Sequence, residues 1–269
     1  MKVKVMHNSK NEEFAKDILE KLAVNEIEVT EVDPDIVCMI GGDGTFLKCS
    51  RIMNYSEDIC FVGINGGNLG YLQNVSTEEI DELVEYLKEN NVPEIRNSSS
   101  NITLAKVILR FKDGKAIEDS VINELQISGK KYHKIEFKLS DNFGFEEEVL
   151  ASGLVLSTPI GSTAYNKSLG GPVICEGVDV ICATLIAPIQ NSKTKDYITN
   201  TLISNEFRLE IISDISDIDL FFDGDEPDYN FDDLESIEIS INSKKIKKIN
   251  LKGTSYSENI KEKILKKNS

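Results

Sequence analysis

Residues 36–47 read Ile-Val-Cys-Met-Ile-Gly-Gly-Asp-Gly-Thr-Phe-Leu, an apolar run that ends in glycines placed around one aspartate. The apolar run predicts a buried strand, and a helix is expected to begin at Thr45. Glycine permits backbone conformations and close approaches that a Cβ would forbid. Backbone N–H groups on such a turn, followed by a helix N-terminus, can bind a phosphate. This stretch therefore predicts a phosphate site, with Gly41, Gly42, Gly44 and Thr45 as candidate contacts.

Asp43 stands in the middle of this turn and would by itself repel an anion. A metal ion, or the proton of a substrate hydroxyl, would have to lie between them. A phosphate cradle that contains an acid suggests phosphoryl transfer, with Asp43 as general base or metal ligand. The alternative is an ordinary strand-to-helix turn capped by an aspartate. The turn matches neither the Walker A loop nor the dinucleotide fingerprint, because Gly-Lys-Ser/Thr and Gly-x-Gly-x-x-Gly are both missing.

Strand and helix patterns alternate over the first part of the chain. Apolar strand patterns occur at residues 2–6, 27–32, 36–40 and 59–64, and amphipathic helix patterns occur at 10–22, 45–53 and 76–88. This alternation predicts a doubly wound, mostly parallel sheet, with sites at the carboxyl ends of its strands. We therefore expect an α/β nucleotide-binding domain over residues 1–97.

After residue 97 one β-like segment follows another. Residues 102–111 and 117–127 are two such runs, and Asp113-Gly114 between them is a hairpin signal. The series continues and predicts an all-β sandwich over residues 98–251, which we expect to bind the dinucleotide. A last helix is expected within residues 252–269, and it could pack back on the first domain.

The composition excludes several classes of function. The chain has 269 residues and a formal net charge of −16, which argues against a general nucleic-acid binder. No apolar segment is long enough to span a bilayer, and residues 1–5 do not resemble a signal peptide, so no membrane partner is expected. An odd number of cysteines without a Cys-x-x-Cys pair predicts reduced thiols in a cytoplasmic protein.

Four further segments carry polar residues that a plain β structure does not need. They are Asn65-Gly66-Gly67-Asn68-Leu69-Gly70-Tyr71, the pair Asn123-Glu124, the hydroxyl-rich residues 157–168, and the turn Phe222-Asp223-Gly224-Asp225. The first is a second glycine-rich strand end that could face the same crevice as the first turn. The buried carboxylate of the second needs a partner. The third could offer hydroxyls and N–H groups to a nucleotide and a ring to its base. Individually, each also has a purely structural reading: a turn, an edge-strand pair or a surface loop.

Taken together and in this order, the segments resemble the NAD kinase family. The matching elements are Gly41-Gly42-Asp43-Gly44-Thr45, Asn65-x-Gly-x-Leu69-Gly70, Asn123-Glu124 and Thr158-Pro159-x-Gly161-Ser162-Thr163-Ala164-Tyr165. The first element is shared with diacylglycerol and sphingosine kinases. The Asn123-Glu124 pair and residues 158–165, which we call the Thr-Pro loop, are much more specific to the NAD kinase family.

The resemblance implies a two-domain fold with the active site between an α/β domain and a β-sandwich. It implies transfer of the γ-phosphoryl group of ATP to the 2′-hydroxyl of the adenosine ribose of NAD, which gives NADP. It also implies Mg²⁺ or another divalent metal, whose ligands it leaves open, and a homotetramer or homodimer.

The resemblance also implies roles for single residues. Asp43 would be the base for the 2′-hydroxyl, and Gly44 would lie against the substrate. Asn123 and Glu124 would bind the adenosine half. Further NAD contacts would come from Asp43 itself, Tyr71, Ser152, Thr163, Ala164, Tyr165, Ser168, Ala187 and Asp225, and further phosphate contacts from Asn65 and Gly67.

The chain departs from the family pattern at two of these positions. Ser152 stands where the family usually has an aspartate that helps to hold the nicotinamide end, and Asp225 stands where members commonly have Gln or His. The choice between NAD and NADH therefore stays open. Two alternatives also remain at this point: a lipid kinase of the diacylglycerol type, which would show Gly-Thr-Gly-Asn-Asp in place of Asn65–Gly70, and a catalytically silent nucleotide-binding protein.

Overall fold

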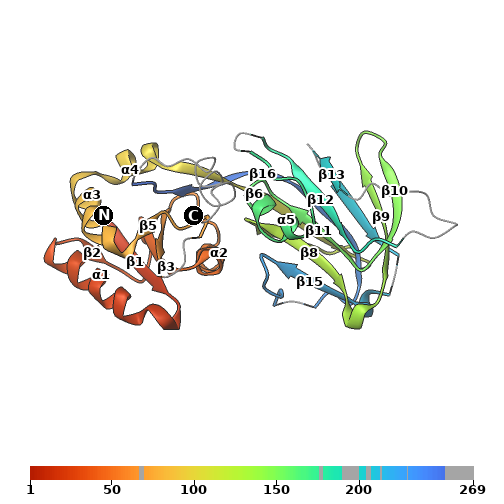
Figure 1. The fold of residues 1–269 in the computed structure, drawn as a ribbon, viewed down its shortest axis with the longest axis horizontal. Coiled ribbons are helices and arrows are strands. Elements are labelled where there is room, and N and C mark those ends of the chain that lie inside the picture. Colours follow the sequence, from red (N-terminus) through yellow and green to blue (C-terminus); the bar gives the residue numbers. More distant parts are fainter. Residues whose placement is uncertain are drawn as a thin grey trace, which may run out of the picture. The chain divides into compact units, whose positions relative to one another are not determined.

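The computed structural model describes residues 1–66, 70–175, 178–189, 200–203, 207–212, 214–228 and 230–251. The chain divides into two compact units (Figure 1). The first unit comprises Met1–Ile102 and the segment that begins at Lys244, and the second comprises Thr103–Ser243. The helix expected within residues 252–269 lies outside the described residues.

The first unit contains a parallel sheet with the spatial order β2-β1-β3-β4-β5. Its strands are β1 (Lys2–His7), β2 (Glu28–Val29), β3 (Ile36–Gly41), β4 (Cys60–Asn65) and β5 (Val75–Ser76). Its helices are α1 (Glu12–Val24), α2 (Asp43–Ile52), α3 (Ile80–Glu89) and α4 (Val92–Ser98). None of the described helices is long and apolar enough to cross a membrane.

Alternate residues of β3 and β4 serve two different cores, which is why these strands are apolar without interruption. Cys38 and Val62 belong to a cluster that includes Ile18 of α1 and Leu83 of α3. Phe61 instead lies beside Phe46 of α2, with 6.4 Å between the ring centroids. The predicted mostly parallel α/β sheet is therefore confirmed.

Three elements depart most clearly from the predictions. The strand expected at residues 27–32 is reduced to β2, and α2 begins at Asp43, two residues before the expected start. Helix α4 was not predicted, although its start carries sequence signals: Asn91 and Glu94 form a capping box, and Pro93 lies in the first turn.

The second unit is built from antiparallel strands in two sheets. One sheet has the order β10-β9-β14-β16 and also contains β6 and β7, and the other has the order β13-β12-β11-β8-β15. Their bounds are β6 (Ser100–Phe111), β7 (Ala116–Val121), β8 (Glu124–Gly129), β9 (Ile135–Asp141), β10 (Glu146–Ala151), β11 (Gly153–Ser157), β12 (Ile181–Ile186), β13 (Asn200–Ile203), β14 (Phe207–Ile211), β15 (Ile218–Phe222) and β16 (Leu234–Lys248). One short helix, α5 (Tyr165–Ser168), follows β11.

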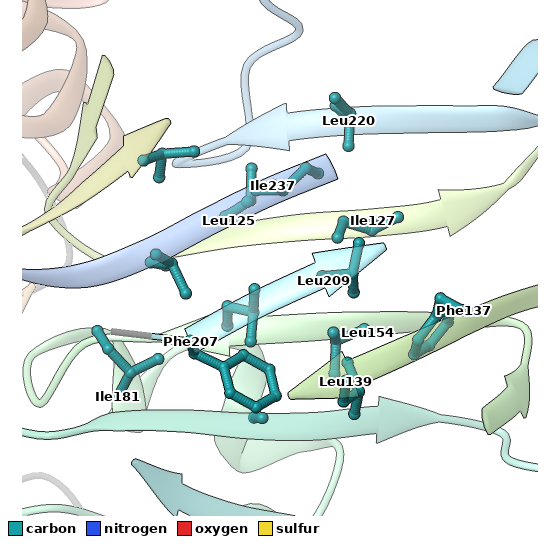
Figure 2. Close-up of a cluster of buried hydrophobic side chains, with 14 of the residues drawn as sticks. Leu125, Ile127, Phe137, Leu139, Leu154, Ile181, Phe207, Leu209, Leu220 and Ile237 are labelled. Carbon is teal, nitrogen blue, oxygen red and sulfur yellow. The ribbon is translucent and has the colours of Figure 1, made fainter. Parts of the chain in front are cut away.

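Side chains from both sheets form one core in the second unit (Figure 2). Leu125 and Leu154 come from one sheet, and Phe137 and Leu209 come from the other. The predicted all-β sandwich is therefore confirmed. The run expected as a single strand at residues 117–127 is broken into β7 and β8, and the break coincides with Asn123.

Candidate active site

The glycine turn (residues 41–45) leads from the buried strand β3 into α2. Gly42 has an extended backbone (φ −95°, ψ −177°) and is the N-cap of a helix whose first residue is Asp43. A Cβ added to Gly41 would collide with the Thr45 side chain and approach the Asn8 amide nitrogen at 2.9 Å. A Cβ on Gly42 or Gly44 would meet no atom within 4 Å. Gly41 is thus required by packing, whereas Gly42 and Gly44 border open space at a helix N-terminus.

The second glycine-rich segment holds the Asp43 carboxylate. Asp43 Oδ2 accepts the backbone N–H of Tyr71, and Oδ1 accepts that of Leu72, each at 2.8 Å. A Cβ on Gly70 would collide with this carboxylate, so the close approach needs glycine. An ionised carboxylate offers about four acceptor positions, and two donors therefore orient the group while leaving it able to accept a further proton donor.

Tyr71 lies beside this carboxylate. Burial raises the pKa of the Tyr71 phenol, and the negative charge of Asp43 raises it further. Both effects favour the protonated hydroxyl, which can act as a hydrogen-bond donor.

Two asparagines that the sequence analysis missed support the glycine turn. Asn11 is buried and donates from Nδ2 to Asn8 Oδ1 at 2.7 Å, and Asn8 donates to Thr45 Oγ1 at 3.3 Å. A Cβ on Gly66 would collide with the Asn11 side chain. The structure thus joins the carboxyl ends of β1, β3 and β4. The position of Asn8 directly after the first strand was the available signal. Asn65 ends β4, and Gly67 lies outside the described residues.

In the second unit, the Asn123–Glu124 pair lies where β7 stops and β8 starts. Its backbone is held by Asp223, which follows β15. Asp223 Oδ1 accepts the N–H groups of Asn123 at 2.7 Å and Glu124 at 3.2 Å, and Oδ2 accepts that of Ile122 at 2.9 Å. The Asp223 N–H in turn donates to the Glu124 carbonyl at 3.0 Å.

Glu124 is 9% exposed, and its Oε2 atom has no hydrogen-bond partner among the described residues. Burial raises the pKa of Glu124 to about 8, and the charge of Asp223 contributes to the shift. The carboxyl group of the ligand-free protein therefore carries a proton over much of the neutral range. A buried polar group without a partner is costly, and such groups are typical of ligand sites.

The Thr-Pro loop contacts this pair from the other side. Thr158 donates its N–H to the Asn123 carbonyl at 2.8 Å and its hydroxyl to the Ile122 carbonyl. A Cβ on Gly161 would collide with the Asn123 backbone. The glycine of this loop is therefore explained by close packing on Asn123.

Three hydroxyls of the Thr-Pro loop donate to carbonyl groups of the chain itself. Ser162 donates to the Pro159 carbonyl at 2.6 Å, Thr163 donates to the Ile160 carbonyl at 3.1 Å, and Thr158 is bonded as described above. The reading of this segment as a surface loop is wrong, because Thr158, Ser162 and Thr163 are buried. The loop is compact because its hydroxyls satisfy its own carbonyl groups.

Asn166 anchors α5 and was missed from the sequence. Its fully buried amide donates to the carbonyls of Ser162 (3.2 Å) and Pro172 (3.0 Å) and accepts the Thr184 hydroxyl at 2.6 Å. Tyr165 and Ser168 on the same helix remain exposed, and Ala164 just before it is half-buried.

The remaining predicted NAD contacts lie at strand ends of the second unit. Ser152, between β10 and β11, donates its N–H to the Ile186 carbonyl at 2.9 Å, which places it beside the start of the turn at Ala187. Ala187 has φ +45°, a rare conformation for a residue with a Cβ. Asp225 is exposed in the turn after β15. Over the described part of the chain, no group of at least three His, Cys, Asp or Glu side chains is arranged to hold a metal ion.

Both halves of the chain match known protein families. Residues 2–92 match the model of the ATP-NAD kinase N-terminal domain, and residues 120–251 match that of the ATP-NAD kinase C-terminal domain. The chain is 32% identical to the NAD kinase of Enterococcus faecalis over 242 residues, which cover 88% of each chain. It is 28% identical to the NAD kinase of Lactococcus lactis subsp. cremoris over 254 residues, or 92% of each chain.

Solved structures show the same fold. The yeast NADH kinase complexed with NADH has a TM-score of 0.80 at 20% identity, over 98% of this chain and 87% of that chain. The NAD kinase from Archaeoglobus fulgidus in complex with ATP has a TM-score of 0.68 at 20% identity, over 95% of this chain and all of that chain (100%). From the matches of both domains and the identity to curated relatives, the chain belongs to the ATP-NAD kinase family.

Proposed function

We propose that this protein transfers the γ-phosphoryl group of ATP to the 2′-hydroxyl of the adenosine ribose of NAD and so makes NADP. Membership in the ATP-NAD kinase family supports the overall reaction. The observation that carries the residue-level proposal is the Asp43 carboxylate, held by two backbone N–H groups at the N-terminus of α2. A lipid kinase is not retained, because both domains match the ATP-NAD kinase models.

Asp43 is proposed as the general base. A ribose hydroxyl is a weak nucleophile near neutral pH, and a positioned base typically contributes about 10²–10⁴-fold to the rate. The proton of the 2′-hydroxyl moves to the Asp43 carboxylate while the oxygen attacks the γ-phosphorus of ATP, and ADP leaves. The hydrogen bonds from Tyr71 and Leu72 hold the carboxylate in one orientation, which reduces the entropy lost in reaching the transition state.

The phosphates of ATP are proposed to bind at the glycine turn. Gly42 and Gly44 leave space beside the first N–H groups of α2, where the helix dipole favours negative charge. Gly41 and Thr45 shape this turn through their packing against each other and Asn8. Asn65 and Gly67 are proposed as further phosphate contacts on the resemblance alone.

A divalent metal is proposed to accompany ATP. Mg²⁺ is usually held by phosphate oxygens and water, together with one or two carboxylates, and Asp43 is the carboxylate at the glycine turn. This donor set fits a metal that is carried by the phosphates rather than caged by the protein. When bound, the metal would neutralise the phosphate charge that Asp43 would otherwise repel.

The second unit is proposed to bind the dinucleotide. The unpartnered Glu124 Oε2 and the neighbouring Asn123 amide can pair with the hydroxyls and base of the adenosine half. Reading a hydroxyl with a buried polar group gives strong selectivity, because an analogue without it leaves that group unpaired. The other proposed contacts are Tyr165 as a stacking surface, with Tyr71, Ser152, Thr163, Ala164, Ser168, Ala187 and Asp225.

A cytoplasmic homotetramer or homodimer is also proposed, on the basis of the family resemblance. The thiols of Cys38, Cys49, Cys60 and Cys182 are buried, and burial raises the pKa of Cys38 to about 12. Such thiols are unreactive, which suits a protein that keeps them reduced.

The test is an assay of the purified protein with ATP, Mg²⁺ and either NAD or NADH, in which an NADP-specific dehydrogenase detects the product from NAD. Product that disappears in Asp43→Asn, with NAD binding retained by calorimetry, would support both the reaction and the base. Turnover like that of the wild type in Asp43→Asn would remove Asp43 from the mechanism. NAD binding without product from either dinucleotide would instead indicate a silent nucleotide-binding protein.

A further inference from the structure

We propose that Asp223 is a positioning residue that holds the Asn123–Glu124 pair in the conformation that binds the dinucleotide. This inference rests on the proposed function, in which the pair contacts the adenosine half of NAD. Asp223 itself need not touch the ligand, since its carboxylate is bonded to the backbone of residues 122–124.

The strand ladders do not support the backbone at this point. The last paired residue of β7 is Val121, opposite Ala105, and the first paired residue of β8 is Glu124, opposite Ser157. Ile122 and Asn123 therefore lie between two ladders. A buried backbone N–H without a partner costs free energy, so an acceptor from elsewhere in the chain is required. Asp223 supplies that acceptor for both residues and also for Glu124.

The backbone conformation at position 223 and the bonds made there favour aspartate. The backbone there has φ +54°, and the following Gly224 has φ +87°, so the turn favours residues that tolerate the left-handed region. Aspartate and asparagine both do so, but only aspartate presents two acceptor oxygens. The three N–H groups are divided between Oδ1 and Oδ2, and an ionised acceptor also makes the stronger bond.

The Thr-Pro loop completes the clamp. The carbonyl of Asn123 accepts the Thr158 N–H, while its N–H donates to Asp223, so the backbone of this residue is held from both sides. The directions of the Asn123 and Glu124 side chains are thus set by two loops rather than by a continuous strand. Removing one loop contact should alter binding of the dinucleotide more than the chemical step.

The test compares the kinetics of Asp223→Asn with those of the wild type. We expect the KM for NAD to rise by about tenfold or more, because the free energy of one charge-assisted hydrogen bond corresponds to about that factor in an equilibrium constant. We expect kcat to fall by less than roughly threefold and the KM for ATP to stay unchanged, since the pair is proposed to contact the adenosine half of NAD and not the phosphates of ATP. An unchanged KM for NAD in a folded Asp223→Asn protein would overturn the proposal.

Asp141→Asn is the matched control. Asp141 Oδ1 also accepts backbone N–H groups, from Phe143 at 2.8 Å and Phe145 at 2.9 Å, in the turn between β9 and β10. The substitution removes the same negative charge, but the one amide oxygen of asparagine can still accept both N–H groups, so the KM for NAD should not change. An equal rise in KM in both variants would mean that loss of a negative charge from the unit, rather than positioning of the pair, explains the effect.

Variants of the pair separate failure of this inference from failure of the proposed function. If Asn123→Ala and Glu124→Gln leave NAD binding unchanged, the proposed binding role of the pair is wrong. If they weaken binding and Asp223→Asn does not, the role of Asp223 is wrong. In the Asn123→Ala/Glu124→Gln background, adding Asp223→Asn should raise the KM far less than it does in the wild type, because residues that act together are not additive.

Amide hydrogen exchange of the wild-type protein keeps the proposal testable if Asp223→Asn does not fold. The N–H groups of residues 122–124 should exchange slowly, like those of the neighbouring strands, although two of them lie outside the strand ladders. Exchange as fast as that of an exposed turn would show that the Asp223 contacts do not persist in solution, and the inference would fall.

Discussion

The carboxylate of Asp43 accepts the backbone N–H of Tyr71 at 2.8 Å, although the two residues are 28 positions apart in the chain. The N–H of Leu72 bonds to the other carboxylate oxygen at the same distance. The loop after β4 therefore orients the side chain that we propose as the catalytic base. Gly70 makes this approach possible, since a Cβ there would collide with the carboxylate.

This contact predicts that Asp43→Asn affects stability as well as turnover. An amide has one acceptor oxygen, so one of the two N–H groups loses its partner. We expect the free energy of unfolding to fall by about 1–3 kcal/mol, measured by urea denaturation. Asp58→Asn is the control, because the Asp58 side chain is 98% exposed and the substitution removes the same charge. Equal stability of Asp43→Asn and the wild type would contradict the bonding described here.

The glycines of the turn should respond differently to alanine. Gly44→Ala adds a Cβ that meets no atom, and alanine suits a helix better than glycine, so stability should be unchanged or rise by about 0.5–1 kcal/mol. Its KM for ATP should nevertheless rise if phosphates occupy that space. Gly41→Ala should instead destabilise the fold by about 1–3 kcal/mol, because the Cβ collides with Thr45. Thermal melting and ATP titration distinguish the two, and an unaltered KM in Gly44→Ala would place the phosphates elsewhere.

The raised pKa of Glu124 predicts a pH-dependent stability of the ligand-free protein. Its pKa lies at about 8 in the folded state, against an ordinary value of 4.5. Between these values the folded protein keeps a proton that the unfolded chain has lost. The free energy of unfolding should therefore fall as pH rises across this interval, by at most roughly 1.4 kcal/mol per pH unit, and this contribution should be fully present below it.

Glu124→Gln tests this linkage, because glutamine is neutral throughout. Urea denaturation at several pH values should show a smaller slope in Glu124→Gln than in the wild type. Glu118→Gln, an exposed position on β7, should keep the wild-type slope. The same slope in all three proteins would show that Glu124 does not retain its proton in the folded state.

Ser152→Asp should tighten the binding of NAD if Ser152 faces the nicotinamide end. A carboxylate would add charge where the family usually has one, and it would favour the cationic oxidised ring over NADH. A gain of about fivefold to tenfold, measured by calorimetry, corresponds to one added charge-assisted contact. Unchanged affinity for both dinucleotides would show that this position does not contact the nicotinamide.

Thr184→Val should loosen the Thr-Pro loop. The substitution removes the hydroxyl that bonds to Asn166 Oδ1 and leaves that buried oxygen with one donor fewer, at a cost of about 1–3 kcal/mol. Thr201→Val, at a half-buried position on the adjacent β13, is the control and should cost less than about 1 kcal/mol. If the two variants are equally stable, Asn166 does not depend on Thr184.

Local patterns were sufficient for much of the fold. The apolar run that ends in Gly41 and Gly42 predicts the fully buried strand β3, because a strand covered on both faces has no polar positions. The sandwich follows from repeated β-like runs with turn signals. Weak local signals caused the errors: β2 is only two residues long, and α4 rests on a capping box rather than on a long apolar stripe.

The sequence by itself determined the family, the class of each unit and the identity of the acidic residue at the glycine turn, because these depend on short-range patterns and on a motif. The tertiary structure decided which groups hold that motif in place. The bonds from Tyr71 to Asp43, from Ile122 to Asp223 and from Thr184 to Asn166 join residues 28, 101 and 18 positions apart. Such pairs form only after separate strands and loops pack together, and no local periodicity encodes which polar group will face which backbone N–H.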